Sequence, residues 1–152
     1  MFSEDLKLRG TINLVAKHSN GVTFCERTIH NTVTTAGKNA VAGLIVTDVS
    51  GTAFDAVAIG VGTPGTTALG SESVTNGGTR RSGVNVTGTV PTSGTAQWVT
   101  TFTFTGALAI TEEGIFNSTT SNAGTMLASQ SFSAINVIAT DTLQITHQVV
   151  MS

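Results

Sequence analysis

The second half of the chain consists of short β-forming segments that recur about every ten residues, with Gly-containing turns between them. The clearest segment spans residues 97–105, where Trp98, Thr100, Phe102 and Phe104 occupy alternate positions. This period of two indicates a strand with one buried face. The other strands predicted in this half span residues 84–90, 126–132 and 142–150. Regularly spaced short strands are typical of β-sandwiches and β-barrels, so we expect an all-β domain.

The start of the chain predicts a β-hairpin. Apolar and polar residues alternate over residues 6–14, which indicates a half-buried strand. Residues 19–21, Ser-Asn-Gly, are a tight-turn signal, and residues 22–29 return as a second strand. We therefore expect residues 1–30 to form an N-terminal arm and hairpin, and residues 31–152 to form a β-sandwich domain. No repeat or linker is evident, so the two parts are expected to make one compact unit.

One short helix is predicted after the hairpin. Thr34 or Thr35 can cap its N-terminus, and apolar residues recur at helical spacing over residues 41–45. Residues 54–61 are a short apolar run, which we expect to form a buried strand. Residues 62–78 are rich in Gly, Thr and Ser and predict a long surface loop.

Composition argues against several classes of function. Charged residues make up only 11% of the chain, and the formal net charge is −2. Nucleic-acid binding needs a dense basic stripe, whereas Arg80 and Arg81 are the only adjacent basic pair, so no nucleic-acid partner is expected. No apolar run approaches the ~20 residues of a membrane helix, and residues 1–10 lack the apolar core of a secretory signal. We therefore expect no membrane partner and synthesis in a cytoplasm, and the single Cys25 excludes an internal disulfide.

Two further patterns are weak indications of a bound cofactor or metal. Residues 60–65 match G-x-G-x-x-G, but Pro64 and a Thr/Gly/Ser-rich stretch follow where a phosphate site needs a helix to begin. His18, His30 and His147 are scattered and lack the close spacing of metal ligands. His147 falls within a predicted strand, and we expect it to face solvent or a partner chain. No cofactor and no metal are therefore expected.

Adjacent Glu112 and Glu113, followed by Gly114, raise the question of an acid/base pair. Neighbouring side chains of a strand point to opposite faces, so these two carboxylates cannot converge on one substrate. We therefore expect a strand–turn–strand element, in which Gly114 permits a backbone conformation closed to other residues. One Glu is expected to face solvent, and the other to accept hydrogen bonds from turn amides or to pair with Arg80 or Arg81. A catalytic role is not expected.

Five segments, spread over nearly the whole chain, carry a likeness to a known family. They read LKLRGTINLV, NTVTTAGKNAVAGLI, AVAIGVGTPGTTALGSES, ITEEGIFNSTTSNAGTMLASQSF and DTLQITHQVV, with the Arg pair between the third and the fourth. In this order they resemble a widespread group of small virion proteins of tailed bacteriophages. Members typically read N-x-V-x-x-x-G, AIGxGTT, E…R, ITExGLFN, GTMLARxxF and GDTLxIT. The chain departs from them at Ser129, where Arg is usual, and at Thr140, where Gly usually precedes the Asp.

The resemblance implies a jelly-roll-like β-sandwich with a structural, non-enzymatic role in the virion. Similar proteins are assigned either as head decoration (cement) proteins or as tail-associated components. We predict a decoration protein that binds the major capsid protein lattice on the outer surface of the head, and the family habit implies a homotrimer. The alternative is a tail- or fibre-associated protein that contacts the host surface. A glycan hydrolase is a third hypothesis, against which stands the lack of a convergent acid/base set.

The N-terminal segment is the candidate contact region. Residues 1–8 mix apolar and acidic side chains. We expect Met1, Phe2, Leu6 and Leu8 to anchor the protein to the capsid or to a neighbouring protomer.

Overall fold

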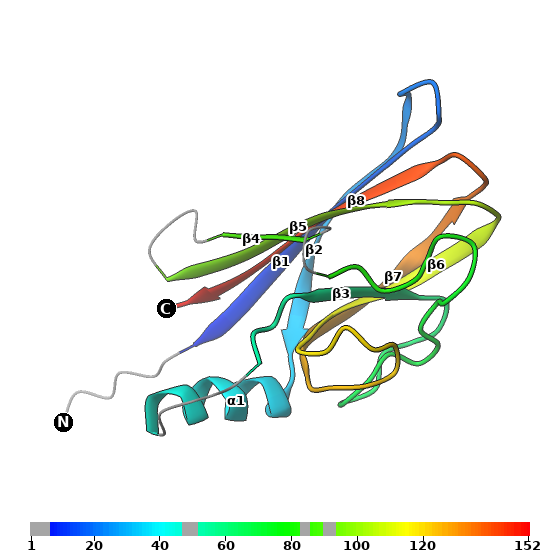
Figure 1. Ribbon diagram of the computed structural model, residues 1–152. Helices are drawn as coiled ribbons and strands as arrows, with labels where there is room; N and C mark the ends of the chain where they lie inside the picture. The colour runs from blue at the N-terminus through cyan, green and yellow to red at the C-terminus, as the bar shows by residue number, and fades with distance from the viewer. Residues whose placement is uncertain (1–6, 47–51, 83–85, 90–93) are drawn as a thin grey trace.

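Figure 1 shows the computed structural model of the chain, which describes residues 7–46, 52–82, 86–89 and 94–152. The strands are β1 (Leu8–Lys17), β2 (Thr23–Val33), β3 (Ala56–Gly60), β4 (Val86–Thr89), β5 (Thr95–Thr103), β6 (Leu108–Phe116), β7 (Met126–Val137) and β8 (Thr142–Met151), and the helix is α1 (Thr35–Val46). The predicted all-β class with one short helix is confirmed for the part of the chain that the structure describes.

The strands form an antiparallel sheet in the order β3-β6-β7-β2-β1-β8-β5-β4. The sheet folds over, so that strands from its two halves pack against one apolar core. That core includes Val57 and Ile59 of β3, Ile115 of β6, Ile12 of β1 and Ile145 of β8. β2 joins the two halves, because it pairs with β1 along most of its length and with β7 only at its end. The fold is therefore a β-sandwich whose two layers are continuous through β2.

The predicted N-terminal hairpin is present and lies at the centre of this sheet, whereas the first six residues of the predicted arm lie outside the described residues. β1 is paired along its length with β2 on one side and β8 on the other. Its alternate residues Ile12, Leu14 and Ala16 are wholly buried. The expected boundary at residue 30 falls within β2, so the hairpin and the sandwich share one core. Residues 17–22 are exposed, and this tip projects beyond the rest of the sheet at the top of Figure 1.

β6 replaces the predicted strand–turn–strand element. The strand runs without a turn from Leu108 to Phe116 and pairs with β3 and β7 on its two sides. Gly114 lies inside it, and its φ is not among the positive values of the chain, so the predicted special conformation is wrong. A Cβ at this position would lie 3.1 Å from the Phe116 ring and 3.2 Å from Leu69. Gly114 therefore allows close packing rather than a turn.

The alternating pattern of residues 97–105 is confirmed. Trp98, Thr100 and Phe102 of β5 are buried, and Phe104 is buried directly after the strand ends. β7 extends further than predicted, to Val137, and this extension pairs with the first residues of β6.

Helix α1 begins where the sequence predicts. The buried Thr34 caps it, because its Oγ1 accepts a hydrogen bond from the Gly37 amide at 2.9 Å. The Thr34 hydroxyl in turn lies against the Met126 carbonyl, which fixes the helix to the start of β7. Within the described residues, no helix is long and apolar enough to cross a membrane.

Candidate functional site

Glu112 is the centre of a small anion site formed by backbone amides. Its carboxylate is wholly buried and accepts hydrogen bonds from the amides of Gly62, Gly70 and Ser71 at 3.0, 2.8 and 2.7 Å. All three donors belong to the loop that follows β3. A Cβ at Gly60 would collide with this carboxylate, which accounts for the glycine there. The Gly-rich loop therefore binds the protein's own carboxylate, in the manner in which such loops bind phosphate.

Glu113 points to the opposite face of β6 and bridges the two layers of the sandwich. Nδ1 of His147 in β8 donates to it, at 2.9 Å from Oε1 and 3.0 Å from Oε2. Nε2 of His147 lies 2.5 Å from the side-chain nitrogen of Asn31 in β2. The Trp98 ring packs edge-on against the His147 ring, with 5.9 Å between the two ring centres. Glu113 and His147 are both wholly buried, so the contact between them is closed to solvent.

These positions confirm two expectations and correct two. The two carboxylates do face opposite sides of the strand, and Glu112 accepts hydrogen bonds from loop amides. The expectation that one Glu faces solvent is wrong, because the loop after β3 covers one face of β6 and β8 covers the other. The expectation that His147 faces solvent or a partner is wrong for the same reason, since it fills the space between the layers.

Arg80 pairs with Glu72 and not with either residue of the Glu pair, so of the two predicted alternatives the hydrogen bonds from loop amides are the one that occurs. Its Nε and Nη2 donate to the two carboxylate oxygens of Glu72 at 3.0 and 2.6 Å. Nη1 donates to the carbonyls of Ser118 and Ala123 at 2.7 and 3.0 Å. The guanidinium also lies 4.0 Å from the centre of the Phe116 ring. This buried ion pair therefore ties the loop after β3 to the loop between β6 and β7.

Arg81, the other predicted partner, lies on the opposite side of the backbone. Its guanidinium is 5.4 Å from the centre of the Phe102 ring, and Nη2 donates to the Gly77 carbonyl at 3.4 Å. Its backbone pairs with Val57, so residue 81 also covers the outer edge of β3. Arg81 therefore packs over the core and does not pair with Glu112 or Glu113, which have other partners.

Sequence reasoning missed Glu72 and Asn31 as members of these clusters. Glu72 lies in a segment predicted as a featureless surface loop, although the E…R element of the family likeness could have indicated its pairing with Arg80. Asn31 lies at the centre of the sheet, beside Gly10 of β1. Its contact with His147 joins residues far apart in the sequence, and no local pattern indicates it.

The anchoring candidates lie mostly outside the described residues. Met1, Phe2 and Leu6 fall there, while Leu8 begins β1 and is half-buried. Leu8 lines an apolar pocket of about 570 Å³ between α1 and the ends of the strands. Other apolar side chains of this pocket are Val41, Phe54, Trp98, Leu127 and Met151. Trp98 donates across it to the Phe54 carbonyl at 2.5 Å.

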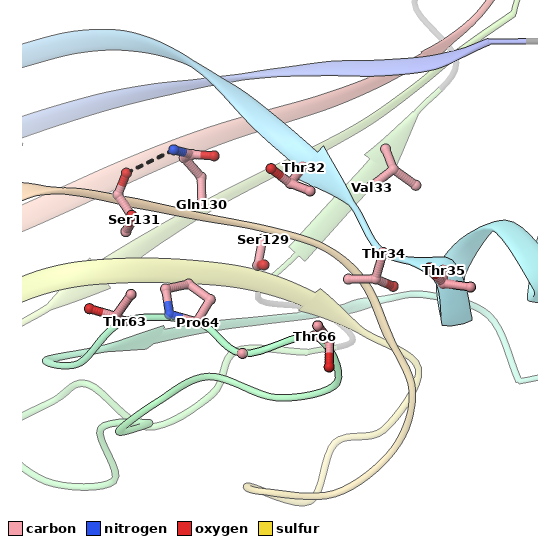
Figure 2. A pocket seen from close by; sticks show the side chains of 11 residues that line it. Thr32, Val33, Thr34, Thr35, Thr63, Pro64, Thr66, Ser129, Gln130 and Ser131 are labelled. Atoms are coloured by element: carbon pink, nitrogen blue, oxygen red, sulfur yellow. Dashed lines mark hydrogen bonds between the residues drawn. The ribbon is translucent and has the colours of Figure 1, made fainter.

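A second pocket, of about 340 Å³, is lined by uncharged residues, most of which are Thr or Ser (Figure 2). It lies where β2 ends, between α1, β7 and the loop after β3. Hydroxyl groups come from Thr32, Thr34, Thr35, Thr63, Thr66, Ser129 and Ser131, and Gln130 adds an amide. No carboxylate or imidazole is among its lining residues, so it offers hydrogen bonds but no acid or base.

The remaining titratable contact joins the two turns at the far end of the sheet. Nδ1 of His18 lies 3.0 Å from Oδ1 of Asp141, and the Ile138 amide donates to Oδ2 at 3.0 Å. Burial by itself raises the pKa of the Asp141 carboxyl, but the hydrogen bonds from Ile138 and His18 outweigh it, so the pKa lies below its usual value. Asp141 is therefore a structural anion that holds the turn between β7 and β8.

The acidic residues of these clusters have partners within the protein. Glu72, Glu112, Glu113 and Asp141 are each buried and bonded to groups of the protein itself. Among the described residues, no group of His, Cys, Asp and Glu is arranged to hold a metal ion. No protein-family model, curated protein or solved structure matches the chain. Membership of the bacteriophage virion family therefore stays a prediction from the sequence motifs.

Proposed function

We propose that this chain is a non-enzymatic structural protein of a tailed-bacteriophage virion: a decoration (cement) protein that binds the outer head lattice as a homotrimer and stabilises it. The proposal comes from the ordered likeness of five sequence segments to small virion proteins. One structural observation supports it. The segments that carry the likeness meet in two buried clusters, one around Glu112 and one around Glu72 and Arg80.

Those clusters indicate what the motifs are for. The AVAIGVGT segment supplies the Gly62 amide to Glu112 of ITEEGIFN, and the neighbouring Glu72 binds Arg80. An enzyme motif would place its acids at a surface that a substrate can reach. Here the same acids hold loops to strands, so the motifs encode a rigid scaffold.

A rigid scaffold of this kind suits a decoration protein. Such a protein acts by burying surface on an existing lattice, so its function is complementarity rather than turnover. A symmetric oligomer that contacts several capsid subunits gains affinity, because each contact after the first is intramolecular. A protein that spans subunits also raises the free energy needed to separate them when packaged DNA presses on the shell.

The alternative is a tail- or fibre-associated protein that contacts the host surface. The observation that favours it is the hydroxyl-lined pocket of Figure 2, because neutral hydroxyl and amide groups can hydrogen-bond a host glycan. That pocket has no aromatic side chain among its lining residues. Sites that bind the flat face of a ligand frequently contain one, so this observation counts against the alternative.

The experiment that tests the proposal uses expanded heads assembled without this protein. Purified full-length chain is added, and co-sedimentation with the heads is measured as a function of concentration. The proposal predicts saturable binding at a simple ratio to the capsid subunit, together with an increased temperature of head disruption. Absence of binding to heads, with binding to purified tails or to host cells, would favour the alternative.

A further inference from the structure

The outer edge of β2 is open over most of its length. Within the described residues, β2 pairs with β1 from Thr23 to Asn31, but β7 pairs with β2 only at Thr32 and Val33. Alternate residues of this stretch therefore present backbone N–H and C=O groups that no described strand pairs on that side. This edge is longer than a mean strand of about five to six residues, and exposed edges of this length are templates for another strand.

The side chains along this edge follow an order of apolar, cationic, apolar. Cys25, Arg27 and Ile29 alternate along it, and all three are half-buried. Cys25 and Ile29 pack against the core, as does the half-buried Phe132 of β7. Arg27 donates through Nη1 to the backbone carbonyl of Ser133 in β7, which is a neutral acceptor. The edge thus presents the Arg27 guanidinium, which is bonded to a carbonyl and not to a carboxylate. It lies between the half-buried apolar side chains of Cys25 and Ile29.

We propose that residues 2–6 of a neighbouring copy of this chain add to β2 as an extra strand. The segment reads Phe2-Ser3-Glu4-Asp5-Leu6. In an extended chain Phe2, Glu4 and Leu6 project from one face, since the side-chain period of a strand is two. Their order of apolar, acidic, apolar is complementary to that of the β2 edge. Glu4 opposite Arg27 would replace the contact to the neutral carbonyl with an ion pair, in which donor and acceptor are both charged.

The donor must be a second copy, because a chain cannot reach its own edge. Lys7 continues the pairing of β1 with the end of β8, and Arg27 lies opposite Leu14 of β1. Leu14 is about 23 Å along β1 from Lys7 at the usual rise per residue of a strand. The three residues from Lys7 back to Glu4 span at most about 10 Å. Glu4 therefore falls well short of Arg27 in its own chain.

Charge also selects the direction of the added strand. With Glu4 opposite Arg27, an antiparallel strand sets Asp5 against Glu26, and like charges directly opposite are destabilising. A parallel strand sets Asp5 near Thr28 and Phe2 near Cys25, without a like-charge contact. Each copy donates one segment and accepts one, so the contact is heterologous, and a rotation of one third of a turn between copies would close it into the proposed trimer. The inference rests on the proposed homotrimer and names the contact that holds it.

Charge reversal tests the contact in the full-length protein. Glu4→Arg and Arg27→Glu should each raise the dissociation constant of the oligomer about tenfold in sedimentation equilibrium, and the double variant should recover most of that loss. Asp5→Arg is the matched control, because it changes the net charge equally on the opposite face. An unchanged constant in Glu4→Arg, no recovery in the double variant, or a monomeric parent protein would overturn the inference.

Cross-linking gives a second test that does not depend on stability. Phe2→Cys, oxidised in air, should form an intermolecular disulfide with the native Cys25 and give covalent dimer and trimer bands on a non-reducing gel. Ser3→Cys, which projects to the other face, should not. Equal cross-linking of the two variants, or none in either, would contradict the proposed register. Failure of both tests with normal binding to heads would remove this inference alone, whereas loss of head binding by the parent chain would remove the proposed function.

Discussion

Nδ1 of His147 lies 2.9 Å from Oε1 of Glu113, and neither side chain is exposed to solvent. The contact joins β8 in one layer of the sandwich to β6 in the other. Buried polar groups that satisfy one another cost little, but removing one of them leaves its partner without a bond in a region from which water is excluded. The pair therefore fixes how the two layers meet.

Replacing Glu113 should strongly destabilise the protein. Glu113→Ala leaves His147 without its acceptor and opens a cavity, so we expect a loss of about 3–5 kcal/mol in the free energy of unfolding. Urea denaturation followed by tryptophan fluorescence measures it, since Trp98 packs against His147. Glu26→Ala, at an exposed position of β2, is the control and should change stability by less than about 0.5 kcal/mol. Similar losses in both variants would contradict a role for the buried pair.

Glu112→Gln should loosen the loop after β3 while leaving the sheet intact. The Gln side chain keeps one acceptor oxygen but replaces the other with an NH₂ group. The N–H donors of that group then face loop amides that are themselves donors. We expect a loss of about 2 kcal/mol. Hydrogen exchange should accelerate at the amides of Gly62, Gly70 and Ser71, whereas the amides of β1 that pair with β8 should exchange as before. Unchanged protection of the three loop amides would show that Glu112 does not hold them.

Arg80→Lys should disrupt the junction between the two loops, although the charge is kept. An ammonium group cannot make the two-pronged contact with Glu72 and also reach both carbonyls on the far side. The expected loss is about 2–3 kcal/mol by thermal or urea unfolding. Arg9→Lys, at an exposed position of β1, supplies the control. Equal stability of the two lysine variants would contradict the account.

Asp141 should make stability depend on acid pH. Its pKa is lower in the folded protein than in the unfolded chain, so the unfolded state binds more protons as the pH falls. The contribution of Asp141 is therefore complete above its unfolded pKa, near pH 4, and disappears as the pH falls through the lower folded pKa. Asp141→Asn should be less stable than the parent at neutral pH, and the difference should shrink below about pH 4. A constant difference across this range would contradict the prediction.

The sequence was most informative where structure depends on local pattern. The alternation of Trp98, Thr100 and Phe102 predicted β5 and its buried face, and Thr34 predicted the start of α1, because both signals lie within a few residues. The central position of β1 was not predictable from its own alternation. A half-buried strand has the same pattern at an edge as in the middle of a sheet, and only its partners decide between them.

The errors at Glu112, Glu113 and Gly114 have a common physical cause. Two acids and a glycine resemble a turn when a solvent-exposed environment is assumed. The two faces of β6 are instead covered by the loop after β3 and by β8, so each acid bonds to donors from distant parts of the chain. Contacts of this kind depend on the completed fold. The arrangement of Glu72 with Arg80 is similar, since a loop without periodicity gives no sign of which of its residues are buried.

Copy number in the purified virion tests the central claim most directly. The amount of this protein is measured against the major capsid protein by quantitative mass spectrometry, with labelled peptides of both as standards. A decoration protein is predicted to be present at a number equal to that of the capsid subunits or at a simple fraction of it. A few copies per particle, in the proportion of tail or neck proteins, would contradict the assignment to the head.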